Sequence, residues 1–442
     1  MESTYLQQSI RSLRKSAKRL ASSTETERNQ LLQMIGEGLR RDWETIKVAN
    51  ERDILKAKES GQRESLVKRL VFNDEKLHAS LLGLEQVASL PDPIGTIKQR
   101  RELDEGLLLE QIVVPIGVIG MIFEARPDAL IQIASLCLKS GNGIILKGGR
   151  EAFQTNTAIV ASIRESCKPS RLGSDWLLLL ESHSDVDTML GMEGDIDLLI
   201  PRGSNAFVRY VMDNTSIPVL GHADGICHLY IDAKADIAKA VEIAYDAKTQ
   251  YPAACNAIET LLVHAQIAPD ILPLLAERFK EAGVVMHGDE QASHFMDCIP
   301  YQEGDWKKEY LALEINIHVV ESLSEAIDHI ETYGSHHSDA IVSEDDDSIR
   351  TFFAGVDSAD VFANCSTRFA DGFRFGLGSE VGISTAKIHA RGPVGLEGLM
   401  TTKYLVRGSG QVVASYTKDG GRSFSHQDLP LDGPSMLGEE VL

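Results

Sequence analysis

The chain has 442 residues, of which 43% are hydrophobic and 25% are charged, so it can bury large cores and should divide into two or three globular domains. Its formal net charge of −21 repels polyanions and argues against nucleic acid as a partner. No apolar run is long enough for a membrane span and no signal peptide is evident, so we expect a cytoplasmic protein without a membrane partner.

Two amphipathic helices are predicted at the start of the chain. Apolar residues recur at helical spacing from Leu6 to Leu20, and Thr24 with Glu27 forms a capping box that begins the second helix. These helices should pack as an N-terminal layer. Residues 101–114 then alternate between apolar and polar side chains around an Asp-Glu-Gly turn, which is typical of a β-hairpin.

From residue 113 onward, short apolar runs alternate with helical patterns. The predicted strands of a first series are VIGMIF, GIILKG, WLLLLE, IDLLIP and IPVLG, and those of a second series are ICHLYI, AIETLLVH, VVMHG, LEINIHVVE and DAIVSE. Strands that are apolar on both faces and alternate with helices indicate a parallel sheet covered on both sides. The sequence therefore predicts an α/β protein with two doubly wound parallel-sheet domains.

The C-terminal part breaks this rhythm. Residues 401–416 read as a strand, a Gly-rich turn and a second strand, and with 101–114 they form a small predicted β ribbon for oligomerisation. Residues 417–442 are rich in Gly, Ser, Pro and Asp without an apolar period, so we expect disorder there.

Cysteine placement offers one candidate for chemistry. None of the six cysteines has a spacing that resembles a zinc site, so no metal site is predicted. Cys255, in YPAACNAIETLLVH, stands in a short break between a helical pattern and an apolar strand, where a thiol can be a nucleophile or an inert half-buried residue. Cys365, in NCST, is the other cysteine outside a regular apolar pattern.

Glycine-rich turns provide candidate phosphate sites. FGLGSEVG follows an irregular segment and its glycines have the wrong spacing for a dinucleotide fingerprint, so we interpret it as a loop. In IPRGSNAF, Gly203 and Ser204 follow a buried strand and open a helix, which suits either an anion or a simple N-cap. In ILKGGRE, Lys147 and Arg150 flank two glycines at the end of a strand. This segment can be a phosphate-binding site or simply a solvated turn.

Several longer motifs, read together, resemble the aldehyde dehydrogenase superfamily and, within it, the gamma-glutamyl phosphate reductase branch. They are VPIGVIGMIFEARPDALIQIASLCLKSGN, ILKGGREAFQTN, IDLLIPRGS, AKTQYPAACNAIETLLV, HSDAIVSED and FANCSTRFADGFRFGLGSEVGISTAKIHARGPVGLEGL. The resemblance covers nearly the whole chain. It implies an aldehyde dehydrogenase-like fold, and the reduction of gamma-glutamyl phosphate to glutamate 5-semialdehyde with NADPH in proline biosynthesis.

The resemblance also assigns roles to single residues. Cys255 matches the family nucleophile, which forms a thioester that then accepts hydride, and the Asn256 amide is a candidate donor to the oxyanion. Arg126 and Arg368 are the candidate cations for the substrate carboxylate and phosphate. Glu314 matches the glutamate that holds the nicotinamide ribose, and Cys365 is assigned a structural role.

Two departures from ordinary aldehyde dehydrogenases bear on the chemistry. Val219 stands where those enzymes carry the glutamate that activates water, so the thioester should escape hydrolysis. Arg150 stands three residues after Lys147, where NAD-preferring relatives carry an acid, and a cation there favours NADPH. Gly203 and Ser204 complete the predicted cofactor residues.

The predicted domain boundaries follow the same comparison. A cofactor-binding domain covers 1–100 and 115–225 with a return segment at about 385–400, and a catalytic domain covers 226–384. The alternatives are a CoA-acylating or hydrolytic aldehyde dehydrogenase and a noncatalytic partner of glutamate 5-kinase. We expect a homo-oligomer, dimer or tetramer, and a contact with glutamate 5-kinase is kept as a further hypothesis.

Overall fold

The protein is described here by a computed structural model, which covers residues 2–180, 184–222, 224–418, 421–432 and 435–437. It divides into two compact units. Unit 1 comprises Met1–Leu220, Leu377–Gly382 and Val394–Leu442, and unit 2 comprises Gly221–Gly376 and Ile383–Pro393. Among the described helices, none is long and apolar enough to cross a membrane.

Unit 1 opens with a series of helices and continues as alternating strands and helices. The opening helices are α1 (Glu2–Ala21), α2 (Glu25–Arg41), α3 (Trp43–Glu59), α4 (Glu64–Leu70) and α5 (Asp74–Ser89). The alternating part comprises β3 (Val118–Phe123), α6 (Pro127–Lys139), β4 (Gly143–Gly148), η1 (Arg150–Ala152), α7 (Phe153–Cys167), β5 (Leu177–Leu179), α8 (Ser184–Leu190), β6 (Leu198–Arg202) and α9 (Asn205–Asp213). The predicted capping box of α2 forms, with Thr24 and Glu27 each bonding the other's backbone.

The sheet of unit 1 has four parallel strands in the order β5-β4-β3-β6. All side chains of β3 and β4 are buried, as expected for a sheet covered on both faces. The apolar stripe of α1, including Ile10 and Leu13, packs in one cluster with Val118 and Ile145 of the sheet. The chain order reverses between β3 and β6, and the carboxyl ends of these strands are where doubly wound sheets bind ligands.

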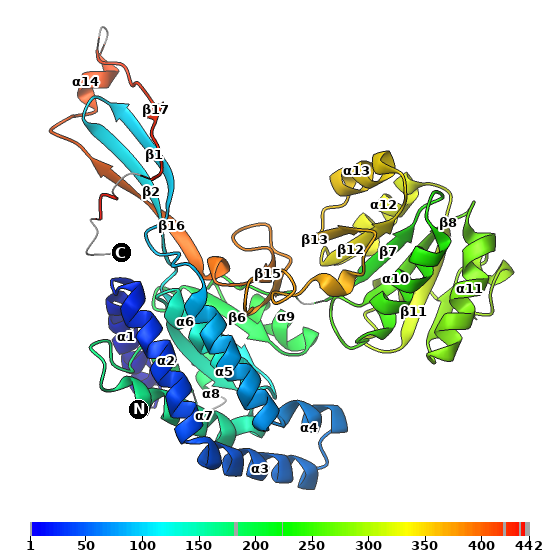
Figure 1. The fold of residues 1–442 in the computed structure, drawn as a ribbon, viewed down its shortest axis with the longest axis horizontal. Helices are drawn as coiled ribbons and strands as arrows, with labels where there is room; N and C mark the ends of the chain where they lie inside the picture. The colour runs from blue at the N-terminus through cyan, green and yellow to red at the C-terminus, as the bar shows by residue number, and fades with distance from the viewer. Residues whose placement is uncertain (1, 181–183, 223, 419–420, 433–434, 438–442) are drawn as a thin grey trace. The chain divides into compact units, whose positions relative to one another are not determined.

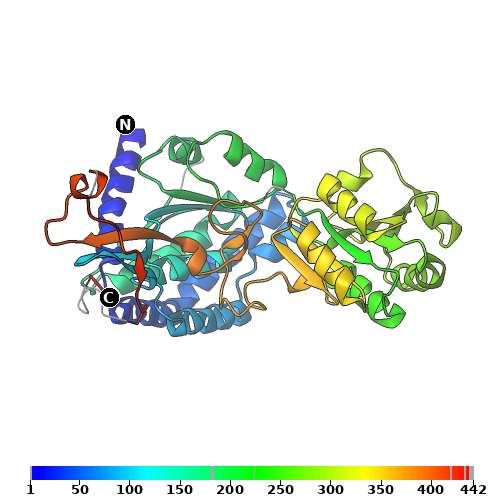
Figure 2. The same cartoon turned by 90° about the horizontal axis from the view of Figure 1, so that it is seen from above.

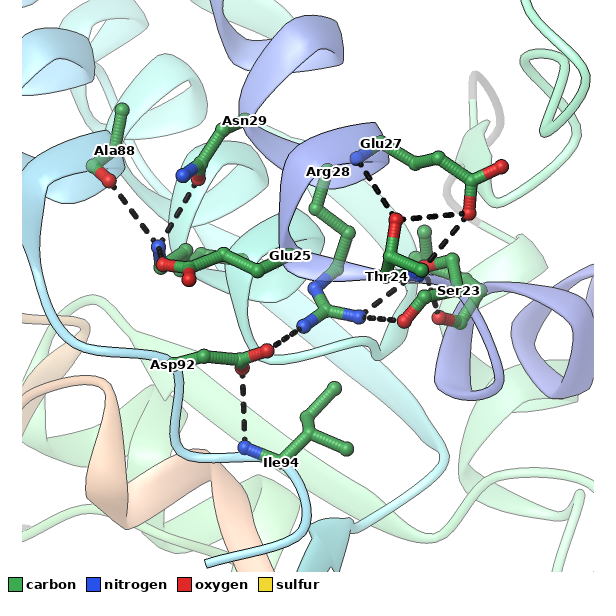
Figure 3. Close-up of polar contacts among 11 residues, drawn as sticks. Ser23, Thr24, Glu25, Glu27, Arg28, Asn29, Ala88, Asp92 and Ile94 are labelled. Atoms are coloured by element: carbon green, nitrogen blue, oxygen red, sulfur yellow. Dashed lines mark hydrogen bonds and ion pairs between the residues drawn. The ribbon is translucent and has the colours of Figure 1, made fainter. Parts of the chain in front are cut away.

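Two buried cations join the start of α2 to neighbouring segments (Figure 3). The Arg28 guanidinium donates to the Ser23 carbonyl oxygen and to the Asp92 carboxylate, and its side chain is fully buried. The Lys139 ammonium donates to Glu25 at 2.7 Å, to Asn29 at 3.0 Å and to the Ala88 carbonyl oxygen at 3.2 Å. Both charges are thus balanced by a carboxylate and further hydrogen bonds, which is the condition for burying them.

A four-stranded antiparallel ribbon, in the order β16-β2-β1-β17, also belongs to unit 1. The predicted hairpin is present as β1 (Ile97–Asp104) and β2 (Leu107–Pro115), which turn through Glu105 and Gly106. Gly106 has φ +70°, a conformation that favours glycine. β16 (Met400–Arg407) pairs with β2 along its whole length, and the two strands lie side by side in Figure 1.

The end of the chain differs from the expectation. The second strand predicted within 401–416 is absent, because α14 (Ala414–Thr417) occupies its last residues. Residues 421–432, expected to be disordered, are described, and β17 (Gln427–Asp428) pairs with β1. Stacking of Phe424 on Tyr416, with ring centroids 4.5 Å apart, supplies an apolar anchor that a search for periodic patterns overlooks.

Unit 2 is the second series of strands and helices. Its regular elements are β7 (Cys227–Ile231), α10 (Ile237–Thr249), β8 (Ile258–His264), α11 (Ala268–Glu281), β9 (Val285–Gly288), η2 (Ala292–His294), β10 (Ile299–Pro300), η3 (Asp305–Lys307), β11 (Glu314–Val320), α12 (Leu323–Tyr333), β12 (Ser338–Val342), α13 (Asp346–Gly355), β13 (Asp360–Ala363) and η4 (Thr367–Phe369). The strands form one parallel sheet in the order β10-β9-β11-β8-β7-β12-β13.

Helices cover both faces of this sheet (Figures 1 and 2). Leu229 and Ile231 of β7 pack in the cluster that contains the apolar faces of α10 and α11. Tyr230, the residue between them, packs in the other cluster, with α12 and α13. This alternation follows from the two-residue period of a strand and explains why strands buried on both faces read as continuous apolar runs.

The boundary between the units differs from the prediction in three places. Ile383–Pro393 belongs to unit 2, so the first part of the return segment predicted at about 385–400 was assigned to the wrong domain. The chain passes from unit 1 to unit 2 after Leu220, ahead of the predicted boundary at residue 225. The predicted strand IPVLG is not formed, since it contributes only an isolated β-bridge between Val219 and Leu199 of β6. Leu377–Gly382 returns to unit 1 ahead of the predicted segment, since the Val381 N–H donates to the Val394 carbonyl oxygen between β14 (Gly382–Ser384) and β15 (Gly392–Val394).

Candidate active site

Cys255 lies in the loop between α10 and β8, at the amino edge of the sheet of unit 2, and its side chain is half-buried. The backbone of this loop is held tightly. A Cβ on Gly225 would lie 2.2 Å from the Cys255 carbonyl oxygen, so only glycine permits this approach. The Cys227 thiol donates to the same oxygen at 3.2 Å. The position of the Cys255 backbone therefore depends on the segment that enters β7.

Two histidines accompany the Cys255 thiol. One ligand atom each of His222, Cys255 and His337 lies within 4.8 Å of the others. The imidazole rings of His222 and His337 are 4.6 Å apart in an edge-to-face arrangement. The spacing of these residues along the chain does not predict the group. The three residues come from three separate loops, which meet only when β7, β8 and β12 pair.

Asn256 is buried, and its amide is already engaged. Its Nδ2 atom donates to the Ala370 carbonyl oxygen at 2.7 Å, and its backbone carbonyl oxygen accepts from the Thr367 hydroxyl at 2.7 Å. Nδ2 carries a second hydrogen, so the amide retains one donor for an oxyanion. The contact with Ala370 also gives Asn256 a structural role that the sequence did not predict.

Arg368 belongs to η4 in unit 2 and lies beside the loop that carries Cys255. Its side chain donates from Nε to the Gln250 Oε1 atom at 2.9 Å and lies 5.9 Å from the Tyr251 ring. Desolvation by burial, followed by the like charge of Arg374, lowers the pKa of Arg368, whereas Cys255 acts in the opposite direction. A largely buried cation with this partner set can attract an anionic substrate group.

Glu314 begins β11 at the same amino edge of the sheet. Its Oε1 atom is 2.8 Å from His287 Nε2 and 3.9 Å from Lys308 Nζ, and the side chain is 29% exposed. The carboxylate is therefore oriented by its neighbours but still accessible to a hydroxyl donor. This placement fits the expectation that it holds a ribose.

A buried ion pair supports the strand that follows Cys255. Lys248 Nζ donates to Glu259 at 2.7 Å and to the Ile258 carbonyl oxygen at 2.9 Å, and neither charged side chain is exposed. Burial raises the pKa of Glu259, and the charge of Lys248 counteracts this effect. The pair ties α10 to β8 on either side of the Cys255 loop.

The other cysteines are poor candidates for a nucleophile. Burial raises the pKa of Cys137, Cys167, Cys227 and Cys365 above the ordinary value for a thiol. Since the thiolate is the attacking species, a raised pKa lowers the reactive fraction near neutral pH. Cys365 in particular follows β13 and agrees with the structural role expected for it.

Four of the predicted cofactor residues lie at or just after the carboxyl ends of strands in unit 1: Lys147, Arg150, Gly203 and Ser204. Lys147 is nearly the last residue of β4, and its Nζ atom donates to the Gly148 carbonyl oxygen at 2.6 Å. Burial lowers the pKa of Lys147. Arg150 begins η1 and is exposed. The neighbouring Glu151 accepts from the Ala125 N–H at 2.7 Å, so this carboxylate is engaged in the β3–α6 turn.

Gly203 and Ser204 stand between β6 and α9, as predicted. Ser204 is the N-cap residue of α9, but its side chain forms no capping hydrogen bond. The Ser204 backbone N–H instead meets the carboxylate of Glu124, whose pKa is raised by desolvation and by the like charge of Glu151. The start of α9 thus attracts an anion, and Glu124 is a residue of this site that the sequence did not reveal.

Arg126 and Val219 also belong to unit 1. Arg126 is exposed at the start of α6, directly after Ala125, which has φ +41°. Val219 is partly buried and packs against the cluster that surrounds α1. An apolar side chain in such surroundings cannot accept a proton from water.

Nearly the whole chain is similar to proteins of known family. The aldehyde dehydrogenase family profile matches residues 2–296. The chain belongs to the aldehyde dehydrogenase family. A gamma-glutamyl phosphate reductase of Cyanothece sp. is 50% identical over 94% of this chain and 96% of its own length. The crystal structure of gamma-glutamyl phosphate reductase from Thermotoga maritima has a TM-score of 0.90 and 40% identity, and covers 92% of this chain and 99% of that chain.

A more distant structure confirms the fold alone. An acetylating aldehyde dehydrogenase from Geobacillus thermoglucosidasius has a TM-score of 0.65 at 16% identity, over 93% of this chain and 98% of that chain. The predicted aldehyde dehydrogenase-like α/β fold is therefore confirmed. Within the family, the relatives at 40% to 50% identity place the chain in the gamma-glutamyl phosphate reductase branch.

Proposed function

We propose that this chain reduces gamma-glutamyl phosphate to glutamate 5-semialdehyde and phosphate, as the second step of proline biosynthesis, through a thioester on Cys255. The observation that carries the proposal is the half-buried Cys255 thiol in a glycine-tightened loop, with the largely buried cation of Arg368 beside that loop. The printed names of the relatives in the gamma-glutamyl phosphate reductase branch support the choice of substrate.

The first step is attack of the Cys255 thiolate on the acyl phosphate carbonyl carbon. The carbon–sulfur bond forms, the carbon–oxygen bond to phosphate breaks, and phosphate leaves with the electron pair. Asn256 is the proposed side-chain donor to the oxyanion, with its remaining Nδ2 hydrogen. Arg368 and Arg126 are the proposed cations for the anionic ends of the substrate.

The second step reduces the thioester. NADPH, when bound, supplies the hydride. The oxyanion on the tetrahedral carbon then re-forms the carbonyl, and the carbon–sulfur bond breaks with its electron pair on sulfur, which yields the aldehyde and the Cys255 thiolate. Because Val219 replaces a water-activating glutamate, no side chain at that position competes by promoting hydrolysis.

The residues of unit 1 fit a dinucleotide phosphate. Lys147 and Arg150 place two cations around Gly148 and Gly149 at the carboxyl end of β4, and the uncapped Ser204 hydroxyl offers a further donor. We assign the 2′-phosphate of NADPH to Arg150, since the neighbouring Glu151 carboxylate is engaged by Ala125. Glu314 is the proposed partner of the nicotinamide ribose.

Assembly and location complete the proposal. β16 forms an edge of the antiparallel ribbon, and its Tyr404 and Val406 side chains are 59% and 57% exposed. An open strand edge with exposed apolar side chains suits pairing with a second copy, so we propose a homo-oligomer built on this ribbon. A cytoplasmic location and a contact with glutamate 5-kinase belong to the same proposal.

The reverse reaction tests the chemistry. Purified enzyme is given glutamate 5-semialdehyde and NADP, with phosphate, arsenate, coenzyme A or no acceptor, and NADPH formation is followed by absorbance. We expect reduction of NADP that depends on phosphate or arsenate. Equal rates without an acceptor would indicate a hydrolytic dehydrogenase, and dependence on coenzyme A alone would indicate an acylating one.

A further inference from the structure

The group formed by His222, Cys255 and His337, termed here the thiol–histidine triad, has the composition of a transition-metal site. Two imidazoles and one thiolate are ligands that Zn²⁺ favours, and they are unsuited to Mg²⁺ or Ca²⁺. All three residues belong to unit 2. Their ligand atoms lie within 4.8 Å of one another, and each residue comes from a different loop at the amino edge of the sheet.

The hydrogen bonds of His222 select one tautomer. His222 Nδ1 is 2.8 Å from the Ile383 carbonyl oxygen, which can only accept, so Nδ1 carries the hydrogen of the neutral ring. The lone pair of the neutral ring is then on Nε2. A ring nitrogen that donates to a backbone carbonyl while the other binds metal is the usual arrangement of zinc-ligating histidines.

His337 provides the second ligand and an independent observation. Its side chain is fully buried, its Nδ1 atom is 2.9 Å from the Ser338 hydroxyl and 3.8 Å from Cys227 Sγ, and its Nε2 atom is buried without a hydrogen-bond partner among the described residues. A buried polar atom without a partner destabilises the folded protein, and a ligand that binds this atom removes the penalty. Nε2 is therefore the atom that a metal ion would use.

The spacing is close to that of a bound zinc. Zn–N bonds of about 2.0 Å and Zn–S bonds of about 2.3 Å place tetrahedral ligand atoms roughly 3.3 to 3.5 Å apart. The ligand atoms of the triad lie within 4.8 Å of one another, at most about 1.5 Å wider than this, so small rotations of the three side chains would bring them to bonding distance. His222 and Cys255 are half-buried, so an ion can enter from solvent, and three protein ligands leave a fourth position for water.

We propose that the thiol–histidine triad binds Zn²⁺ reversibly in the free enzyme and thereby withdraws the Cys255 thiolate from reaction. In this step the thiol releases its proton to solvent, and the sulfur–zinc bond forms with the sulfur electron pair. The inhibitory consequence rests on the function proposed above, whereas the metal site itself does not.

The test uses the full chain without substrate, so that it is independent of the reaction. Zn²⁺ binding is measured by competition with a chromophoric chelator, and Co²⁺ is added separately to detect the absorption of a sulfur–cobalt bond. In parallel, iodoacetamide labelling of Cys255 is followed by peptide mass spectrometry with and without Zn²⁺. We expect one ion per chain, a sulfur–cobalt band, and slower labelling of Cys255 when Zn²⁺ is present.

Matched variants decide between this site and a surface site. His222→Gln should weaken Zn²⁺ binding at least tenfold and remove the protection of Cys255, and Cys255→Ser should abolish the sulfur–cobalt band. His264→Gln is the control, since His264 is also half-buried and its Nδ1 atom also meets a backbone group, the Gln266 N–H. His337→Gln tests the second histidine ligand in the same way. Because His337 is buried, the folding of this variant is checked by circular dichroism.

The outcomes separate the two proposals. Zn²⁺ binding that is unchanged in His222→Gln, or protection of Cys255 that is lost equally in His264→Gln, would overturn the zinc site. A zinc site with these properties in a protein that lacks phosphate-dependent activity would preserve this inference and overturn the proposed function instead.

Discussion

The two parallel sheets present functional residues at opposite edges. In unit 1, Lys147 and Ser204 follow the carboxyl ends of β4 and β6. In unit 2, Cys255 precedes β8 and Glu314 begins β11, so both lie at the amino edge. Backbone N–H groups of helix starts face a ligand at a carboxyl edge and suit phosphate, whereas the amino edge of unit 2 presents mainly side chains. Under the proposed function, the first edge binds the phosphates of the cofactor, and the second edge carries the nucleophile Cys255 together with Glu314, the proposed partner of the ribose.

The largest effect is expected from removal of the Cys255 thiol, the proposed nucleophile. Cys255→Ser should lower kcat by at least about 10⁴-fold, because an alkoxide is scarce near neutral pH and an oxygen ester accepts hydride poorly. Cys298→Ser, another half-buried cysteine of unit 2, is the matched control and should keep near-normal rates. Residual activity in Cys255→Ser with loss in Cys365→Ser would mean that the nucleophile is misassigned.

The buried ion pair below the Cys255 loop should dominate local stability. Lys248→Met leaves the Glu259 carboxylate buried without its cation, which should lower the free energy of unfolding by about 3 to 5 kcal/mol. Urea denaturation measures this change. Lys239→Met, which breaks the exposed pair with Glu344, is the control and should lower the free energy of unfolding far less, because solvent screens an exposed pair. Similar losses in both variants would contradict the importance of burial.

At the other edge, a single charge should set cofactor choice. Arg150→Glu should weaken NADPH use by roughly 1 to 3 kcal/mol in kcat/KM and affect NADH use less, because a carboxylate repels the 2′-phosphate. Arg164→Glu, on the exposed side of α7, controls for the general change in charge. An equal loss with both cofactors would refute the assignment of Arg150.

A buried histidine in unit 2 should add acid sensitivity. Desolvation, followed by the charges of His228 and His318, lowers the pKa of His329 to about 2. A depressed histidine pKa favours the folded state above about pH 6.5, and this contribution is lost as pH falls toward the folded value. Between pH 7.5 and 5.5 the free energy of unfolding of the native protein should therefore fall by about 1.4 kcal/mol through this group. The His329→Gln variant should not show this part of the decrease. Urea midpoints at pH 7.5 and 5.5, compared between the two proteins, provide the measurement; parallel curves would exclude this cause.

The sequence predicted the fold well where local pattern determines structure. Both parallel sheets, the hairpin from β1 to β2 and the capping box at Thr24 follow from periodicity and turn chemistry that neighbouring residues express. The loop that carries Cys255 was found for the same reason, since it breaks two regular patterns. β17 was missed because its strand has only two residues and depends on pairing with β1.

The histidines of the thiol–histidine triad show the limit of such reasoning. His222 has no histidine neighbour and His337 directly follows His336, and nothing near either residue indicates a thiol partner. Their proximity to Cys255 arises from the strand order β8-β7-β12, which no local pattern encodes. Glu124, which directly follows β3, was missed for the same reason, because it reaches Ser204 at the start of α9 only through the pairing of β3 with β6.

The most direct test of the account is to trap the acyl group on the enzyme. Enzyme incubated with glutamate 5-semialdehyde and NADP, without phosphate, is quenched in acid, digested and analysed by mass spectrometry. The account predicts a gamma-glutamyl thioester on the peptide that contains Cys255, which disappears when phosphate is added before the quench. An acyl group on another residue, or NADPH formation at full rate without any acylated peptide, would contradict it.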